Sequence, residues 1–392
     1  MAATLVPQFA SAGLINNVLI QWRGHADKCE DPVQRFPEAM MQVAMFEAIN
    51  AIQPKYKPYL EELNAPAGSS VDAAAASAAH DVLVLVCPDQ KEIFDGALKA
   101  ALEAIPDETA RDAGGKVGRE AAAAVIAARQ DPKGGLQDPV FDPPEPGRYA
   151  STMRRAGFQL ASHKPWVMNS PDELRSAPPP ALDSEIWAKD LEEVKSLGSK
   201  KSKTRTAEQT DSAKFWAGRD TRVVLDQLIG RPGRTLVDDA RFLALAEMAH
   251  ADAYIAMMDG KYHYDLWRPI TAIRHADTDG NAATSPDPQW IGLGETPYHP
   301  EYPCGHCLSA AAAGAVISSE FGSNVPPLVL TGEESMLRRF DTPDEYVNDV
   351  ATSRIYIGVH YRFSVDAGVA AGSAIGKLAA KRHFAPLAKG ME

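Results

Sequence analysis

Apolar residues recur roughly every three to four positions along most of the chain, the spacing that gathers them on one face of an α-helix. Residues 37–53 show this clearly, with Met41, Met45 and Ile49 on a common face. Stretches that alternate apolar and polar residues, the pattern of a half-buried strand, are few. The chain is therefore predicted to be all-α and to fold as a helical bundle.

Capping residues and prolines predict several helix boundaries. Ser70 precedes an Ala-rich helix over residues 70–86, and its side chain is suited to accept a hydrogen bond from a free amide of the first turn. The longest helical pattern covers residues 235–267 and is expected to end or kink at Arg268-Pro269, because proline disfavours helix in the residue before it. Further helices are predicted over residues 88–102, 108–129, 308–321, 344–361 and 365–380.

Two proline-rich stretches, residues 131–147 and 177–180, are predicted to be loops, because proline lacks an amide donor. The basic stretch 200–205 is interpreted as a solvated loop. It leads to Thr206, which forms a capping-box pattern with Gln209. These breaks divide the chain into an N-terminal helical part (1–150), a connecting segment (151–205) and a helical core (206–392).

Length and composition narrow the class of protein. The chain has 392 residues, enough to bury a core without cross-links, and four cysteines, too few for a disulfide scaffold. Its net charge of −12 argues against nucleic acid or an anionic membrane as a general partner. No apolar run of about 18 residues occurs, so no membrane span is predicted. The N-terminal residues lack the pattern of a signal peptide, which favours a cytoplasmic location over export.

The first cluster of candidate chemistry is the pair Lys261 and Arg268, the latter followed by Pro269. Residues seven apart on one continuous helix lie on the same face two turns apart. Both cations are then expected to line one wall of a pocket. Taken alone, such a pair is more typical of a solvated helix surface.

The second cluster is Tyr302-Pro303-Cys304-Gly305-His306, directly before a predicted helix. Free amides at a helix N-terminus, beside a glycine that lets the backbone approach closely, are suited to bind an anion. His306 can exchange a proton near neutral pH. Taken alone, the histidine fits equally well as a residue at a helix cap.

The third cluster is Ser353-Arg354, followed six residues later by His360. The Arg354 guanidinium is planar, with five N–H donors, and therefore suits an oxyanion. His360 is a candidate nucleophile or metal-type ligand. Neither residue is specific on its own, and the order and spacing of the three clusters carry the information.

Together, Lys-x6-Arg-Pro, Pro-x-Gly-His and Ser-Arg-x5-His resemble the motifs of the type 2 phosphatidic acid phosphatase (PAP2) superfamily. That superfamily includes acid phosphatases and vanadium-dependent haloperoxidases. Within it the chain is most similar to the soluble haloperoxidase branch, whose fold is a helical bundle. Further matching stretches are Asp265-Leu-Trp-Arg-Pro-Ile, His299-Pro-Glu-Tyr-Pro and Gly358-Val-His-Tyr-Arg-Phe.

The resemblance implies a site for vanadate, which phosphate can also occupy. In it, His306 is the acid–base residue, and His360 bonds to vanadium or attacks phosphorus. The implied reaction is oxidation of a halide, bromide favoured, by hydrogen peroxide, in a homo-oligomer that we expect to be a dimer. The implied oxyanion-binding residues are Lys261, Arg268, Cys304, Gly305 and Arg354.

The sequence departs from the family pattern at two positions. Cys304 stands where the family has a serine that donates a hydrogen bond to the oxyanion, and a thiol is a poorer donor that peroxide can oxidise. Ser364 stands where the phosphatases have an aspartate that orients the second histidine. The sequence therefore leaves the partner of His360 unidentified. By contrast, His299 agrees with the bromide-using algal members, which also carry a histidine seven residues before His306.

Three alternatives remain open. The chain is also compatible with a phosphomonoesterase that forms a phosphohistidine at His360, and with a non-catalytic anion-binding or scaffold protein. The tetrapeptide Cys304-Gly305-His306-Cys307 matches the redox motif of thiol–disulfide oxidoreductases. Residues 295–303 argue against that reading, because they form a proline-broken stretch where such enzymes need a buried strand.

Overall fold

The structure, a computed structural model, describes residues 17–29, 36–60, 62–129, 145–150, 155–332 and 336–388. Over this part the chain is mainly helical, with one two-stranded sheet, which confirms the all-α prediction. None of the described helices is long and apolar enough to cross a membrane. Most of the proline-rich stretch predicted over 131–147 lies outside the described residues.

The described chain packs as two compact units. One unit contains residues 1–130, 225–247 and 383–392, and the other contains 131–224 and 248–382. Helix α9 (Leu236–Tyr264) and the 3-10 helix Thr221–Leu228 each contribute residues to both units.

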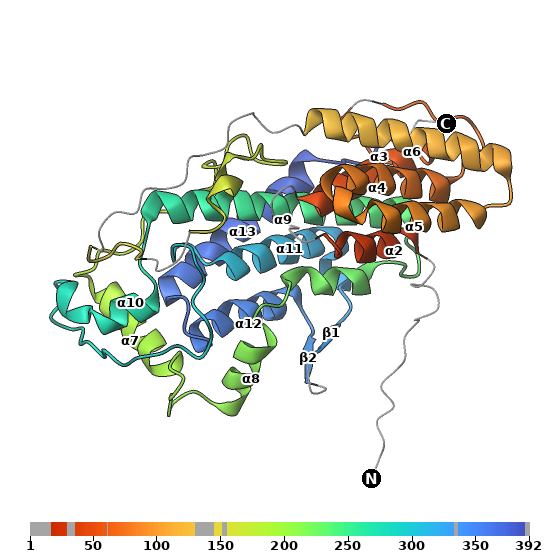
Figure 1. Ribbon diagram of the computed structural model, residues 1–392. Coiled ribbons are helices and arrows are strands. Elements are labelled where there is room, and N and C mark those ends of the chain that lie inside the picture. Colours follow the sequence, from red (N-terminus) through yellow and green to blue (C-terminus); the bar gives the residue numbers. More distant parts are fainter. Residues whose placement is uncertain are drawn as a thin grey trace, which may run out of the picture. The chain divides into compact units, whose positions relative to one another are not determined.

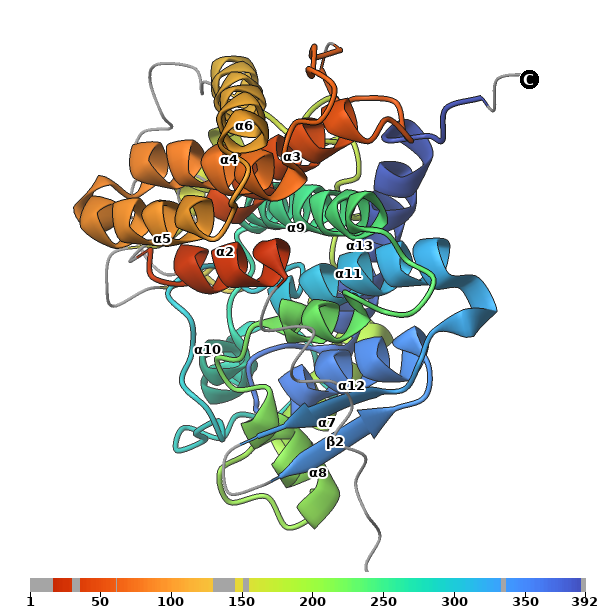
Figure 2. The same ribbon diagram turned by 90° about the vertical axis from the view of Figure 1, so that its right-hand side faces the viewer.

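In the first unit α4 is the central helix and packs against α3, α5 and α6 (Figures 1 and 2). Ser70 caps it as predicted, accepting a hydrogen bond from the amide of Ala73. Gly114 and Gly118 of α6 lie directly against α4, where a Cβ would come within 2.1 and 2.2 Å of backbone oxygens. The helices of this unit are α2 (Val18–Ala26), α3 (Pro37–Ile52), α4 (Val71–Val86), Pro88–Gln90 (3-10), α5 (Lys91–Glu103) and α6 (Glu108–Ala128).

A disulfide in the first unit joins Cys29, which follows α2, to Cys87 at the end of α4. The two cysteines are 58 positions apart in the sequence, and the sequence pattern did not predict that they are bonded.

The second unit contains the remaining helices and the sheet. Its strands are antiparallel, with Leu328 opposite Phe340. The capping box predicted at Thr206 is present, with both reciprocal hydrogen bonds to Gln209. Its elements are Phe158–Ser162 (3-10), α7 (Glu185–Leu197), α8 (Ala207–Phe215), α10 (Pro269–Arg274), Ala276–Thr278 (3-10), α11 (Gly305–Phe321), Gly322–Asn324 (3-10), β1 (Leu328–Thr331), β2 (Leu337–Phe340), α12 (Pro343–Tyr356) and α13 (Arg362–Arg382).

Helices α11 and α13 lie side by side (Figures 1 and 2) because α13 presents a glycine every fourth residue. A Cβ at Gly368, Gly372 or Gly376 would lie 2.6, 2.1 or 2.4 Å from a backbone oxygen of Cys304 or of α11. Such distances are far inside van der Waals contact, so only glycine allows this approach. The stripe thereby fixes the N-terminus of α11, where Gly305 and His306 lie.

The helix predicted over residues 235–267 is shorter than expected. It ends at Tyr264, and Asp265 adopts a left-handed conformation with φ 49°. Arg155 Nη1 donates to Asp265 Oδ1 at 2.7 Å, which holds the turn. Arg268 then becomes the N-cap of α10. The prediction that Lys261 and Arg268 share one helix face is therefore wrong.

The helix predicted over residues 344–361 also ends early, at Tyr356. Gly358 has φ 87°, a conformation that terminates the helix and that side chains other than glycine's rarely adopt. His360 consequently lies in the short connection between α12 and α13, and not on a helix.

The basic loop predicted over residues 200–205 is largely exposed, as expected, except for Arg205. This half-buried side chain donates through Nη1 to the carbonyls of Leu197, Ser199 and Tyr356, at 2.5, 2.8 and 3.3 Å. The loop is therefore attached to the end of α12.

His80 of α4 supplies a pH-dependent contact. Its Nδ1 lies 2.8 Å from Asp81 Oδ1, and its Nε2 lies 2.9 Å from Asp95 Oδ1 of α5. The bond to Asp81 raises the pKa of the imidazole above 6.5, burial opposes this rise, and Asp95 supports it. The stabilisation is thus fully present below the unfolded-state pKa and is lost as pH rises through the folded-state pKa.

We therefore predict that His80→Gln lowers the free energy of unfolding more at about pH 5.5 than at about pH 9. Urea unfolding at both pH values measures this difference. His275→Gln, which alters an exposed histidine, serves as the control. Equal losses at the two pH values would contradict the proposed role of the charged imidazole.

Candidate anion site

Lys261 lies in the last turn of α9 and is fully buried. Its Nζ donates to the carbonyls of Pro300, Glu301 and Pro303, at 3.1, 2.7 and 2.7 Å. Burial lowers the pKa of Lys261, and the nearby Arg268 lowers it further. An ammonium group has three hydrogens, so these bonds use all of them. In this geometry Lys261 holds the loop before α11 and offers an anion its charge only.

Arg268 joins two of the predicted clusters and is also fully buried. It donates through Nε to the carbonyl of His299 at 2.9 Å, through Nη1 to that of Val359 at 2.9 Å, and through Nη2 to that of Pro300 at 3.2 Å. Burial lowers its pKa to about 10, so it remains charged at neutral pH. The guanidinium therefore connects the loop before α11 to the segment that carries His360.

Arg268 also contacts two imidazole rings. Its Nη2 lies 2.9 Å from His299 Nδ1, and its Nη1 lies 3.4 Å from His360 Nε2. Arginine carries donors only, so both ring nitrogens act as acceptors in these contacts. His299 thus lies beside the predicted site.

The neutral form of His360 is fixed by a second partner. Its Nδ1 lies 2.7 Å from Glu301 Oε1 and donates its hydrogen to that carboxylate. Burial lowers the pKa of His360, and the charges of Arg268 and Lys261 lower it further. From the hydrogen-bond pattern, Nδ1 carries the hydrogen and Nε2 is unprotonated, with its lone pair toward Arg268 Nη1.

Glu301 is the site residue that the sequence did not identify. It is fully buried, and Oε1 also accepts a hydrogen bond from the amide of Tyr361 at 3.1 Å. Burial raises its pKa to about 7, against the opposing charges of Arg268 and Lys261. Its carboxylate replaces the aspartate that is missing at Ser364. The only signal for this role was an acidic residue between prolines in the stretch His299-Pro-Glu-Tyr-Pro.

The amides that the sequence predicts to bind an anion lie where α11 begins, at Gly305. The first amides of a helix have no partner within the helix, so they are available to a ligand. A Cβ at position 305 would lie 2.2 Å from Met257 Sδ, so the packing requires glycine there. His306 follows as the second residue of the helix and is partly exposed.

The pKa of His306 is lowered by burial and then by the charge of Arg354, while Asp220 opposes the shift. Asp220, which the sequence analysis did not select, is itself paired with Arg222, whose Nε donates to Oδ1 at 3.1 Å. His306 is therefore expected to be neutral near pH 7 and able to accept a proton.

Arg354, in the last turn of α12, is buried and donates through Nη1 to the carbonyl of Trp216 at 2.8 Å. Burial and Arg268 lower its pKa to about 10, so it also remains charged. Its buried Nε has no hydrogen-bond partner among the described residues. A buried donor left unpaired is costly, and an oxyanion oxygen would satisfy it. The residues present therefore fit a bound phosphate or vanadate.

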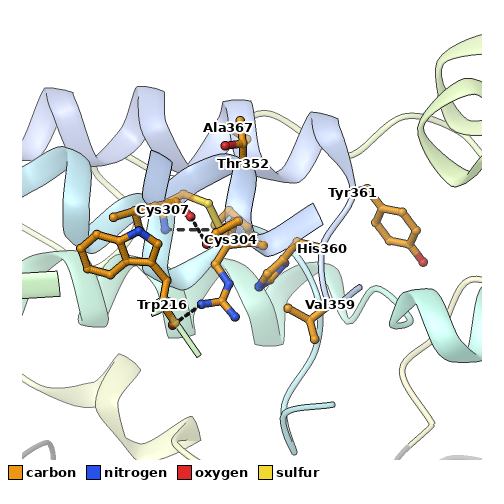
Figure 3. The surroundings of a disulfide bond; sticks show 12 residues. Trp216, Cys304, Cys307, Thr352, Val359, His360, Tyr361 and Ala367 are labelled. Carbon is orange, nitrogen blue, oxygen red and sulfur yellow. Dashed lines mark hydrogen bonds between the residues drawn. A yellow bond between two sulfur atoms is a disulfide. The ribbon is translucent and has the colours of Figure 1, made fainter. Parts of the chain in front are cut away.

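Cys304 differs from the expectation of a free thiol. Its sulfur is bonded to that of Cys307, and the Cys304 sulfur also accepts a hydrogen bond from the Cys307 amide at 3.3 Å (Figure 3). Residues three apart at the start of a helix are neighbours, which permits the link. A disulfide sulfur carries no hydrogen, so in this form Cys304 cannot donate to an oxyanion as the family's serine does.

Two aromatic residues lie near the motifs. Trp267 is buried and stacks on Trp187, with ring centroids 6.0 Å apart. Tyr298 is 49% exposed.

Comparison with known proteins agrees with the motifs. Residues 241–388 match the family model of the VCPO second helical-bundle domain. Vanadium chloroperoxidase of Curvularia inaequalis is 25% identical over 178 residues, covering 33% of this chain and 29% of that protein. The match thus spans less than a third of this curated relative.

Solved structures show the same fold over nearly the whole chain. A bacterial vanadium-dependent iodoperoxidase has a TM-score of 0.75 and 22% identity, with 95% of this chain and 96% of that chain covered. A holo-type bacterial vanadium-dependent chloroperoxidase has a TM-score of 0.69 and 18% identity, with 96% and 93% covered. The fold is that of the vanadium-dependent haloperoxidases. Residues 241–388, which carry the motifs, are thus similar to the second helical-bundle domain of the vanadium chloroperoxidases.

The contact between Glu301 and His360 leads to a prediction about oxyanion affinity. Removing the partner that orients a ligating histidine typically weakens binding by about 10- to 100-fold. We expect Glu301→Ala to weaken orthovanadate binding by this amount in calorimetry, and Glu301→Gln to restore part of it through its amide oxygen. Asp366→Ala, which removes an exposed carboxylate near the same motif, should have no effect. Unchanged affinity in a folded Glu301→Ala protein would rule out the role.

Proposed function

We propose that this protein is a vanadate-dependent haloperoxidase that oxidises a halide with hydrogen peroxide. One observation carries the proposal: His360 is held as a neutral ring by Glu301 at Nδ1, which leaves Nε2 unprotonated and facing the Arg268 guanidinium. The lone pair of Nε2 is what a histidine needs to bond to vanadium. The family match and the fold of the neighbours support the same reading.

The vanadate would be held by residues already in place. Arg268 and Arg354 supply fixed charges, Gly305 a backbone amide, and His360 the ligating nitrogen. When bound, vanadate supplies the oxidising centre at which peroxide and halide react. The chain's own contribution is to neutralise the anion's charge with buried cations whose orientation is fixed before the anion binds.

His306 would handle the proton. A neutral imidazole at the start of α11 can accept the proton that hydrogen peroxide loses on binding, and can return a proton to the oxidised halide product. Burial and the charge of Arg354 lower the pKa of His306, and the carboxylate of Asp220 opposes this by favouring the charged ring.

Bromide is the halide that we propose. His299 stands where bromide-using members of the family have a histidine, and its Nδ1 accepts from Arg268. The neutral ring then carries its hydrogen on Nε2, which is able to donate to an anion. The solved structures with this fold are of an iodoperoxidase and a chloroperoxidase, so oxidation rates compared between chloride, bromide and iodide test this choice, and a higher rate with chloride or iodide would contradict it.

A phosphomonoesterase is the second candidate. The same Nε2 lone pair is suited to attack phosphorus, and Glu301 supplies the carboxylate that the missing aspartate at position 364 would otherwise provide. The two functions share the site and differ in the co-substrate that they require. The non-catalytic scaffold reading lacks a comparable observation, because a fixed lone pair on His360 serves no purpose in it.

A paired assay tests these functions. We expect vanadate-loaded protein with peroxide to brominate monochlorodimedone, and His360→Ala to reduce this rate at least about a hundredfold. His263→Ala, which alters an exposed histidine near the end of α9, is the control and should retain the rate. Hydrolysis of p-nitrophenyl phosphate by vanadate-free protein, without any halide oxidation, would establish the phosphatase instead.

A further inference from the structure

The disulfide between Cys304 and Cys307 encloses the two residues that the proposed site uses most directly. Cys304 is the N-cap of α11, Gly305 and His306 are its first two residues, and Cys307 is the third. The sulfur–sulfur bond therefore closes a ring around the anion-binding amide and the acid–base histidine. Nothing in the proposed halide chemistry uses this bond.

The disulfide is buried beside α12 and α13. Both cysteines are fully buried, and they belong to one hydrophobic cluster with Ala351 and Val365. On α13, a Cβ at Gly368 would lie 3.0 Å from that of Cys307. In Figure 3 the disulfide lies between the labelled pair Thr352 and Ala367 on one side and His360 on the other.

An open groove lies next to the hydrophobic cluster that contains the disulfide. It has a volume of about 700 Å³ between α11, α12 and α13, and Ala351, Thr352 and Val365 are among its lining residues. Two of these, Ala351 and Val365, also belong to the cluster around the cysteines. The groove therefore shares two side chains with the cluster that encloses the disulfide.

We propose that Cys304 and Cys307 form a reversible redox site, whose disulfide form sets the first turn of α11 for oxyanion binding and whose dithiol form binds oxyanions more weakly. The oxidant is hydrogen peroxide, so the inference rests on the proposed function. The reductant is a small thiol of the glutathione class.

The oxidation balances with peroxide alone. One thiolate attacks a peroxide oxygen and becomes a sulfenic acid, and the departing hydroxide takes up the proton that the thiol released. The second thiol then attacks the sulfenic sulfur and expels water. Two electrons pass from sulfur to oxygen, and two waters form. Reduction by two small thiols proceeds through a mixed disulfide and releases the oxidised small thiol.

The two redox states differ at the place where the anion binds. A cysteine at a helix start in a Cys-x-x-Cys pair favours the thiolate, which is stabilised by the free amides and the helix dipole. An oxyanion needs the same amides, so a thiolate at Cys304 competes with it. The disulfide is uncharged and holds the turn closed around Gly305. Reduction introduces a competing negative charge and releases the closed turn. Together these changes are expected to weaken anion binding on the order of tenfold.

The experiment uses the full chain with Cys29→Ser and Cys87→Ser, so that the pair in α11 is the only one. Oxidised protein, protein reduced with glutathione and freed of it, and protein reoxidised with peroxide are compared. Inorganic phosphate is the probe, measured by calorimetry, because thiols reduce vanadate. Alkylation and mass spectrometry count the thiols in each sample. We expect phosphate to bind about tenfold more weakly to the reduced protein and to regain its affinity on reoxidation.

Cys304→Ser with Cys307→Ala in the same background is the matched control, and its phosphate affinity should not respond to reductant or peroxide. Equal phosphate affinity in the oxidised and reduced samples would overturn the redox proposal and leave the proposed function intact. A pair that glutathione does not open in folded protein would overturn it as well. Failure of every sample to bind phosphate or vanadate would instead remove the proposed function, and the redox proposal with it.

Discussion

The burial of Glu301 is the constraint on which the rest of the site depends. Its carboxylate fixes His360, and its carbonyl accepts from Lys261, so one residue connects the ligand-bearing segment to the end of α9. Burying a carboxylate costs free energy unless cations lie beside it, and the buried cations are stabilised by the carboxylate in the same way. Removing either side would leave an uncompensated charge, which is why the network is expected to act as a unit.

Glycine residues determine the position of this network as much as the charged residues do. Glycine at positions 368, 372 and 376 lets α13 approach α11 closely, and glycine at 305 makes room for Met257. These contacts involve backbone and leave little freedom in the position of the α11 N-terminus. Preorganisation of the amides thus comes from packing, while the arginines contribute the charge.

Patterns along the chain predicted the helices, the caps at Ser70 and Thr206, and the motif residues, because each depends on neighbours in sequence. Three features escaped prediction for physical reasons. The end of α9 depends on the left-handed Asp265, which a distant arginine, Arg155, holds. The partner of His360 lies 59 positions away, and only folding shows that Glu301 is buried. The link between Cys304 and Cys307 depends on the oxidation state of the chain, which no spacing encodes.

The left-handed Gly358 ties the site to a turn that belongs to none of the motifs. A Cβ there would lie 2.6 Å from the carbonyl oxygen of Gly198 and 3.0 Å from the Cα of Gly292. Leu293 donates its amide to that same carbonyl, and Gly294 donates to the carbonyl of Ile357, so three backbones are stacked behind His360. These backbone contacts fix the segment two residues before His360. Changes to loop length around residue 198 would thus tune the site from outside it, without touching any residue that meets a ligand.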